Sequence, residues 1–200
     1  MRRLVFKPTA ANLLLMIVMI GVNLGGHYLA DALKLPVWLD TIGTMVVAIL
    51  LGAMAGAIVG GLSVLIMGLI DGSSLIFVPI GLLVGLLVGF FYPREEGKQP
   101  GSVREENGRL LTTVSVAILV ALLSSLLCIP LNMKLNGGYT GNLWGDALYD
   151  MLSRNMDSPL LNAFMAEIFV DIPDRVISLG IAIFLTKFLK FHIFKLAFFF

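Results

Sequence analysis

The chain has 200 residues, of which 58% are hydrophobic and only 14% are charged, and its formal net charge is +1. Since a soluble domain carries about 25% charged residues, this composition and the mean hydropathy of +0.95 exclude an ordinary soluble domain. We expect an all-α integral membrane protein that folds as a single membrane domain over residues 1–200, with spans of about 20 residues. The one cysteine, Cys128, cannot form an intrachain disulfide.

Hydropathy predicts six transmembrane helices. Their expected ranges are 10–33, 38–51, 53–71, 75–92, 110–133 and 159–191. The first apolar stretch is too long for the hydrophobic region of an ordinary signal peptide, so we expect it to remain as a span. The second and third ranges meet at Gly52, where a hairpin or a broken helix is expected. The polar residues 93–109 form a loop between two three-span halves, and residues 134–158 form an external loop.

The distribution of basic residues predicts the orientation of these helices, because short cytoplasmic loops carry an excess of lysine and arginine. With six spans, one side of the membrane receives ten of the fourteen basic residues, namely Arg2, Arg3, Lys7, Arg94, Lys98, Arg104, Arg109, Lys187, Lys190 and Lys195. The opposite side keeps only Lys34, Lys134 and Arg154. Both termini and the loop 93–109 are therefore expected to be cytoplasmic.

The second predicted span opens with the sequence WLDTIGT at residues 38–44. Asp40, Thr41 and Thr44 would present polar atoms on one side of a helix just below the outer surface, which makes them candidates for binding a ligand. The alternative for Asp40 is a favourable interaction with the positive end of the helix dipole. Thr44 favours the pocket, because it continues the polar face one turn deeper.

Two stripes of small residues follow in the third and fourth spans. Each has the spacing GxxxGxxxG, formed by Gly52, Gly56 and Gly60 and by Gly81, Gly85 and Gly89. Such stripes let helices approach closely in lipid, where hydrophobicity does not drive helices together. Packing within the protein is the first interpretation, and docking of a second membrane protein is the alternative.

The external loop and the span before it add three candidate binding residues. Asn132 lies beside Pro130 at the outer end of the fifth span, and Tyr139 and Trp144 lie in the loop. A lid over an outward-facing site is one interpretation of the two aromatic residues. Anchoring of the loop at the membrane surface is the other.

Four ionisable residues interrupt the last predicted span. Glu167, Asp171, Asp174 and Arg175 follow the spacing i, i+4, i+7, i+8 and share one helical face. A charge in the bilayer costs roughly 2.5–3.5 kcal/mol on insertion scales, so we expect these groups to face a cavity, a partner or a ligand. Pro173 is expected to kink the helix. A ligand pocket is favoured, with a structural charge network or proton coupling as alternatives.

Several motifs are missing from the sequence. It contains no P-loop, no HExxH motif, no cysteine and histidine cluster with metal-binding spacing and no GxSxG motif. We therefore expect a protein that is not an enzyme, that needs no cofactor or metal, and that does not bind nucleic acid.

The motif PxWLDTIGT at residues 36–44, the Gly/Ala-rich hairpin after it, and the late motif ExxxDxPDR at residues 167–175 together resemble the substrate-binding S components of energy-coupling factor (ECF) transporters. The resemblance covers residues 10–190. One departure concerns the first span, where the family often has an AxxxA pattern that meets the coupling protein. Residues 10–15, AANLLL, do not match it.

The resemblance implies a multi-pass protein of a prokaryotic plasma membrane that captures a vitamin or a related small heteroaromatic micronutrient near the outer face. Its partners would be a transmembrane coupling protein and two cytoplasmic ATPases, which would supply the energy for uptake. Two other functions stay open. One is a membrane sensor module of a signalling system, and the other is an autonomous transporter that uses the acidic residues for proton coupling.

Overall fold

The computed structural model describes residues 8–92 and 103–197. Within these residues the chain forms seven α-helices, one short 3-10 helix and no strand, which confirms the all-α prediction. In chain order the elements are α1 (Ala10–Ala32), α2 (Ile42–Leu51), α3 (Ala53–Asp71), the 3-10 helix η1 (Ser74–Phe77), α4 (Val78–Phe91), α5 (Val103–Leu135), α6 (Leu143–Ser153) and α7 (Pro159–Ala197).

Four segments of the described chain are long and apolar enough to cross a membrane: Ala10–Ala32, Ala53–Asp71, Ser74–Phe91 and Leu110–Leu135. They indicate a membrane-embedded protein. α2 is apolar but has only 10 residues, and α7 carries ionisable side chains in its middle. The six-span count and the cytoplasmic termini stay predictions. Half of the basic residues used for that orientation lie outside the described residues, namely Arg2, Arg3, Lys7, Arg94 and Lys98.

The second helix begins later than the sequence predicts. Its first residue is Ile42 rather than residue 38, so Trp38, Asp40 and Thr41 lie in the loop before the helix. Leu39 in this loop has a φ of 53°, a left-handed conformation that is uncommon for residues other than glycine. A helical conformation for residues 38–41 is therefore replaced by an irregular turn, whose backbone is held by contacts from α7.

Other boundaries also differ from the prediction. α5 begins at Val103 rather than at residue 110, so the loop predicted for residues 93–109 is helical in its last part, and residues 93–102 lie outside the described residues. The external segment 134–158 contains α6. α7 is one helix that includes Pro173, and the kink expected at this residue stays a prediction.

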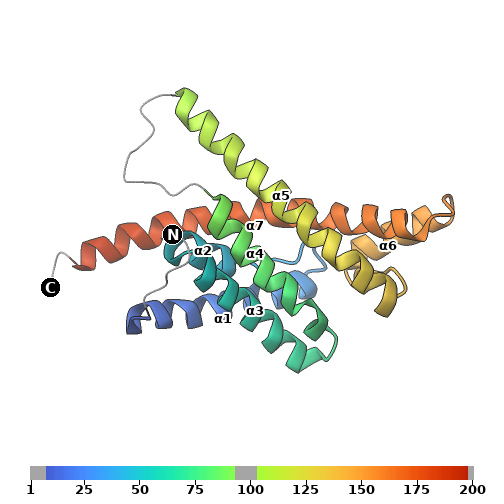
Figure 1. Ribbon diagram of the computed structural model, residues 1–200, viewed down its shortest axis with the longest axis horizontal. Helices are drawn as coiled ribbons and strands as arrows, with labels where there is room; N and C mark the ends of the chain where they lie inside the picture. The colour runs from blue at the N-terminus through green and yellow to red at the C-terminus, as the bar shows by residue number, and fades with distance from the viewer. Residues whose placement is uncertain (1–7, 93–102, 198–200) are drawn as a thin grey trace.

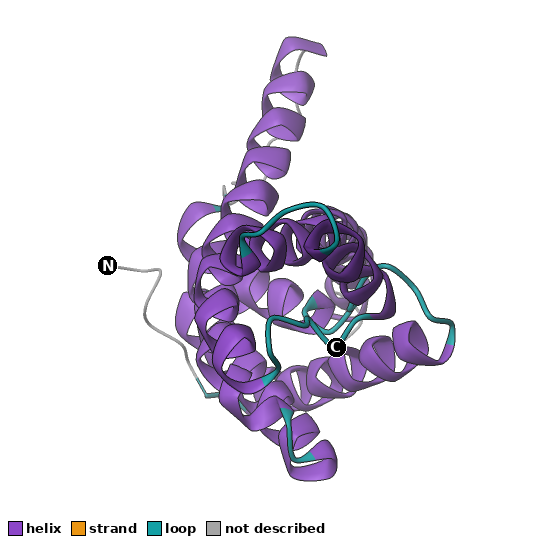
Figure 2. Ribbon diagram, turned by 90° about the vertical axis from the view of Figure 1, so that its right-hand side faces the viewer, coloured by secondary structure: helices purple, strands orange, loops and turns teal. Residues whose placement is uncertain are grey.

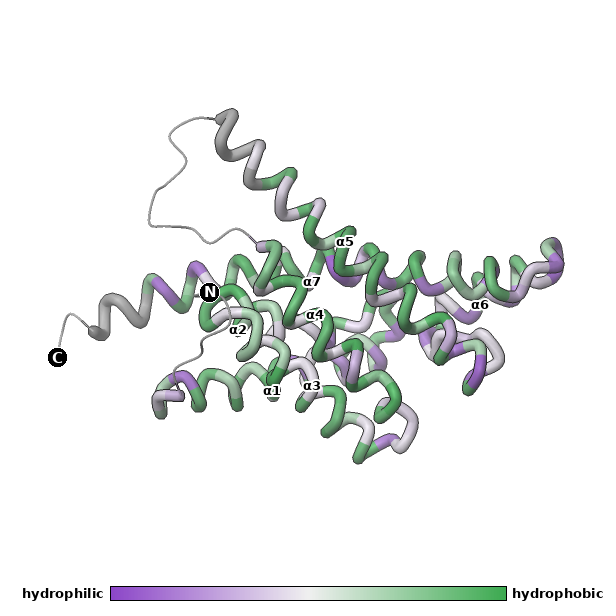
Figure 3. The backbone as a smooth tube through the Cα atoms, viewed as in Figure 1, coloured by the Kyte–Doolittle hydropathy of each residue, from purple (hydrophilic) through white to green (hydrophobic). Residues whose placement is uncertain are grey.

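α7 is the longest helix and runs along almost the whole molecule (Figure 1). α2 lies in the middle of the bundle, where it contacts α1, α3, α4 and α7, while α5 and α6 pack against α7. Viewed from one end, the helices form a bundle, and several loops lie at the end that faces the viewer (Figure 2). Hydrophobic residues predominate along the helices (Figure 3). The core is built on α2, whose Met45, Val46 and Val47 are fully buried.

The glycine stripes bring α3 and α4 into backbone contact. A Cβ atom added at Gly60 would overlap the carbonyl oxygen of Gly81, and one added at Gly85 would overlap the backbone of Gly56. Gly89 meets the backbone of Ala53 in the same way. The glycines of α3 and the glycines of α4 therefore pack against each other inside the molecule. Gly52 differs from the others, because its φ of 104° separates α2 from α3.

A neutral polar network joins α1, α3 and the first turn of α2, next to the turn at residues 38–41. The Nδ2 of Asn23 donates hydrogen bonds to the Oγ1 of Thr44 (2.8 Å) and to the Oγ of Ser63 (2.9 Å). Its Oδ1 accepts one from the backbone N–H of Gly43 (2.6 Å), and Ser63 donates to the carbonyl of Val59 (2.8 Å). The side chains of this network are fully buried. Three helices are thus fixed to one another by groups that satisfy one another.

Candidate functional site

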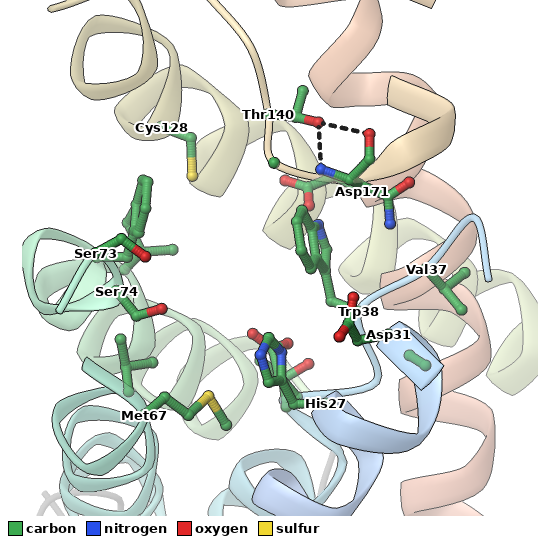
Figure 4. A pocket seen from close by; sticks show the side chains of 18 of the residues that line it. His27, Asp31, Val37, Trp38, Met67, Ser73, Ser74, Cys128, Thr140 and Asp171 are labelled. Carbon is green, nitrogen blue, oxygen red and sulfur yellow. Dashed lines mark hydrogen bonds between the residues drawn. The ribbon is translucent and has the colours of Figure 1, made fainter. Parts of the chain in front are cut away.

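A cavity of about 420 Å³ lies between the last turns of α1 and α3, the loop 33–41, η1, the first turns of α4, the last turns of α5 and the middle of α7. Residues 140–143, which lead into α6, complete its wall. Trp38 and Thr140 lie across the cavity from Ser73, Ser74 and Met67 (Figure 4). Helices from both halves of the chain therefore contribute to one site.

Aromatic rings form one part of the cavity wall. His27 on α1 and Trp38 in the loop have nearly parallel rings, with an interplanar angle of 12° and centroids 6.5 Å apart. The ring of Tyr28 lies edge-on to that of His27. The Nδ1 atom of His27 is buried and has no hydrogen-bond partner in the protein. This part of the wall offers both a flat apolar surface and one unused polar atom.

Arg175 is the centre of the charged part of the site. Its Nη1 lies 2.7 Å from Asp174 Oδ2, 2.9 Å from Thr41 Oγ1 and 3.5 Å from Asp40 Oδ1, and its Nη2 lies 3.6 Å from Asp171 Oδ1. The residue is 4% exposed. Its Nε has no partner in the protein, although Arg175 lines the cavity. One guanidinium group thus holds three carboxylates and keeps one donor unused.

Asp174 differs from the other acidic residues of the site because it binds the backbone of the loop before α2. Its Oδ1 accepts hydrogen bonds from the backbone N–H groups of Trp38 (2.9 Å) and Leu39 (2.7 Å), and its Oδ2 accepts from Arg175. The side chain is fully buried and lies behind the cavity wall. Asp174 therefore fixes the turn that carries Trp38 and Asp40, which explains why residues 38–41 do not continue the helix.

Asp171 and Glu167 line the cavity one and two turns before Arg175. The hydroxyl groups of Ser124 and Ser125 on α5 donate to Asp171 Oδ2 at 3.1 and 2.8 Å. The amide of Asn132, also on α5, donates to Glu167 Oε2 at 2.9 Å. These bonds orient both carboxylates, and a carboxylate has lone pairs for further donors.

Acidic groups outnumber basic groups around the cavity. Its wall contains the two basic side chains Lys34 and Arg175 and the five carboxylates of Asp31, Asp40, Asp71, Glu167 and Asp171. Of these groups only Arg175, Glu167 and Asp171 are buried, and buried charges are stable only when paired or hydrogen-bonded. Two buried carboxylates beside one guanidinium group that also pairs with Asp174 favour an occupant that brings hydrogen-bond donors or a positive charge.

The start of α6 is tied to the loop after α1. Asn142 donates from Nδ2 to the carbonyl of Leu35 (3.1 Å), and Trp144 donates from Nε1 to the carbonyl of Lys34 (2.8 Å). Asp146 accepts hydrogen bonds from Thr140 and from the N–H of Gly141. Residues 140–143 are thereby held against the cavity.

The structure brings six of the ten predicted binding residues to the cavity wall: Asp40, Thr41, Asn132, Glu167, Asp171 and Arg175. The other four lie elsewhere. Thr44 belongs to the network of Asn23, and Asp174 lies behind the wall. Trp144 is 49% exposed and bonded to Lys34. Tyr139 donates to Asp150 (2.7 Å), a bond that raises the pKa of the Tyr139 phenol, and its ring is tilted by 58° against that of Tyr149.

Sequence reasoning missed several residues of the wall. His27 and Cys128 line the cavity, and Ser124 and Ser125 hold Asp171. A pair of serines inside an apolar span is a weak signal for such a role, because serine is common at contacts between membrane helices. His27 does carry a periodic signal, because Asn23 and Asp31 lie four residues before and after it and the three polar residues share one face of α1.

In the described part of the chain, no three histidine, cysteine or acidic side chains come together as a metal site. Comparisons of the chain with protein-family models, with curated proteins and with solved structures found no match. The function is therefore best argued from the geometry of the cavity.

Proposed function

We propose that the chain is the substrate-binding membrane subunit of an ECF-type importer, which captures a vitamin or a related small heteroaromatic micronutrient. The observation that carries the proposal is the cavity itself, where an aromatic wall faces a cluster of oriented carboxylates around Arg175. Its volume of about 420 Å³ lies within the range of small-molecule pockets, about 300–1,000 Å³.

The side chains of the cavity wall restrict the chemical class of the ligand that we propose. Trp38 and His27 offer flat surfaces that suit an aromatic ring. The carboxylates of Asp171 and Glu167 suit N–H or O–H donors or a positively charged nitrogen, which the indole face of Trp38 would also attract. The unused Nε of Arg175 suits one acceptor atom. We therefore propose a compact ring system with several donors on one edge and an acceptor close to them.

Partner subunits would supply the energy. The sequence has no P-loop, so ATP hydrolysis of that type would come from two cytoplasmic ATPases, joined to this chain by a transmembrane coupling protein in the plasma membrane of a prokaryote. The support for these partners is the resemblance of residues 36–44 and 167–175 to ECF S components. Gly56, Gly60, Gly81 and Gly85 pack against one another, so the coupling surface would lie on other residues.

Native mass spectrometry of the gently purified chain tests the binding function. We expect one small organic molecule per chain, released on unfolding and identifiable by its mass. Addition of a metabolite extract to protein stripped of ligand should restore the same adduct. Absence of an adduct in both preparations would contradict the proposal.

Transport measurements separate the proposed importer from an autonomous proton-coupled carrier, which the line of acids along α7 also suggests. Proteoliposomes that contain only this chain should not accumulate the released ligand when a proton gradient is applied. Accumulation should require the coupling protein, the ATPases and ATP. Uptake driven by the proton gradient alone would favour the carrier, and binding without uptake under either condition would favour a sensor.

A further inference from the structure

A second hollow, of about 260 Å³, lies at the end of the bundle opposite the cavity. It is formed by the last turn of α2, the end of α4 and the second half of α7. Lys187 follows Arg175 by twelve residues on α7, which corresponds to about 18 Å at 1.5 Å per residue. The two sites are therefore separate, and the hollow can have its own occupant whatever the cavity binds.

The hollow is basic. Lys187 and Lys190 line it, and their spacing of three residues places them on the same face of α7. The residues of the hollow are Ile49, Leu50, Tyr92, Ile183, Thr186, Lys187 and Lys190, and none of these described residues is acidic. Both lysines are exposed, so their ammonium groups can reach an anion at the mouth.

Thr186 provides a polar atom at the inner side of the hollow. The residue is only 3% exposed, and its Oγ1 has no hydrogen-bond partner in the protein. A threonine within a helix commonly donates to the carbonyl four residues earlier, and a buried hydroxyl without a partner is unfavourable. An oxygen atom from a bound group would satisfy this hydroxyl.

The surroundings of the hollow fit a lipid better than a free ion. Ile49 and Leu50, at the end of the apolar helix α2, and Ile183 of α7 form its apolar side. Basic pockets between membrane helices attract anionic headgroups. We propose that this hollow binds the phosphate group of an anionic phospholipid, with Lys187 and Lys190 supplying the charge and Thr186 a hydrogen bond.

Lipid retention measured by native mass spectrometry tests the proposal. The intact protein is released from nanodiscs that contain equal amounts of phosphatidylglycerol and phosphatidylcholine. We expect the wild-type chain to keep one phosphatidylglycerol in preference to phosphatidylcholine. The double substitution Lys187→Gln and Lys190→Gln should weaken this preference by about thirtyfold, which corresponds to roughly fivefold for each lysine near a membrane surface.

Two further variants complete the test, one for the hydrogen bond of Thr186 and one as a control for charge. Thr186→Val keeps the shape of the side chain and should weaken retention by about fivefold through the lost hydrogen bond. Lys134→Gln with Arg154→Gln removes the same charge from exposed positions outside the hollow and should leave retention unchanged. Equal retention of the two lipids by the wild type, or equal losses in the two double variants, would overturn the proposal.

Inorganic phosphate distinguishes the two possible sources of the anion. In detergent without lipid, added inorganic phosphate should give no stable adduct, because the apolar side of the hollow would stay empty. A stoichiometric phosphate adduct that is lost in the Lys187→Gln, Lys190→Gln variant, together with no preference for phosphatidylglycerol, would replace the lipid by a free phosphate.

Discussion

The packed region of α1, α2, α3 and α4 and the cavity region around Arg175 bury polar groups in opposite ways. In the packed region, Asn23, Thr44 and Ser63 are neutral and bond to one another, next to glycines in backbone contact. In the cavity region, several carboxylates share one guanidinium group, and Arg175 Nε and His27 Nδ1 have no partner in the protein.

This comparison separates the polar residues that hold the helices together from those that line the cavity. A buried polar group that is satisfied within the protein stabilises a unique packing. A buried charge cluster is a poor source of stability, because desolvation offsets the attraction between its members. The proposed binding function accounts for the charged residues of α7 that line the cavity, which the stability of the fold alone does not.

Removal of Arg175 should produce the largest effect. Arg175→Met leaves Asp40, Asp171 and Asp174 without their common partner, and loss of one member of a buried ion pair costs about 3–5 kcal/mol. We expect a large fall in the apparent melting temperature in detergent. Arg154→Met, at an exposed position, is the control. Equal melting temperatures for the two variants would show that the charges are not coupled as described.

Asn23→Leu should have the second-largest effect on stability. It should destabilise the packed region without removing the ligand from the cavity region. The substitution leaves the N–H of Gly43 and the hydroxyl group of Thr44 without their partner, whereas Ser63 keeps its hydrogen bond to Val59. Each orphaned buried group costs about 1–3 kcal/mol. Thermal unfolding should report this loss, while the ligand adduct should persist in the protein that remains folded. A variant of normal stability that has lost the adduct would contradict the division into a structural and a binding network.

Gly85→Ala should have a smaller effect than Asn23→Leu, because overpacking costs about 1–3 kcal/mol in total, whereas Asn23→Leu orphans two buried groups at about that cost each. The added methyl group would meet the backbone of Gly56 and Ala57 and push α4 away from α3. Gly180→Ala is the matched control, because nothing lies within 4 Å of a Cβ atom at that position of α7. Equal unfolding temperatures of the two variants would argue against close α3–α4 contact.

Much of the helical framework can be predicted from the sequence. The third helix is predicted at residues 53–71 and has these bounds in the structure, because Gly52 and Gly72 mark its ends with positive φ angles. The charged face of α7 is also predictable, since the spacing of Glu167, Asp171 and Arg175 places them together on any helix.

Long-range contacts explain the features that the sequence does not reveal. Residues 38–41 have the composition of a helix start, but Asp174, more than 130 positions away, takes up the N–H groups of Trp38 and Leu39. Thr44 has the same polar character as Thr41, yet Asn23 on α1 binds it away from the cavity. No local pattern indicates which of two hydroxyl groups faces the ligand and which faces another helix.

The most direct test of the cavity as a ligand site is the affinity of Asp171→Asn for the molecule released from the wild-type chain. Asp171 lines the cavity, and asparagine in its place has the same size and can still accept the hydrogen bonds of Ser124 and Ser125. Arg175 keeps Asp40 and Asp174 as partners, and the affinity is measured on the protein that remains folded. We expect binding to weaken at least about tenfold, the value of one hydrogen bond to a charged group. Asp157→Asn, at an exposed position, should bind as the wild type does. Equal affinity of Asp171→Asn and the wild type would contradict the assignment of this cavity as the binding site.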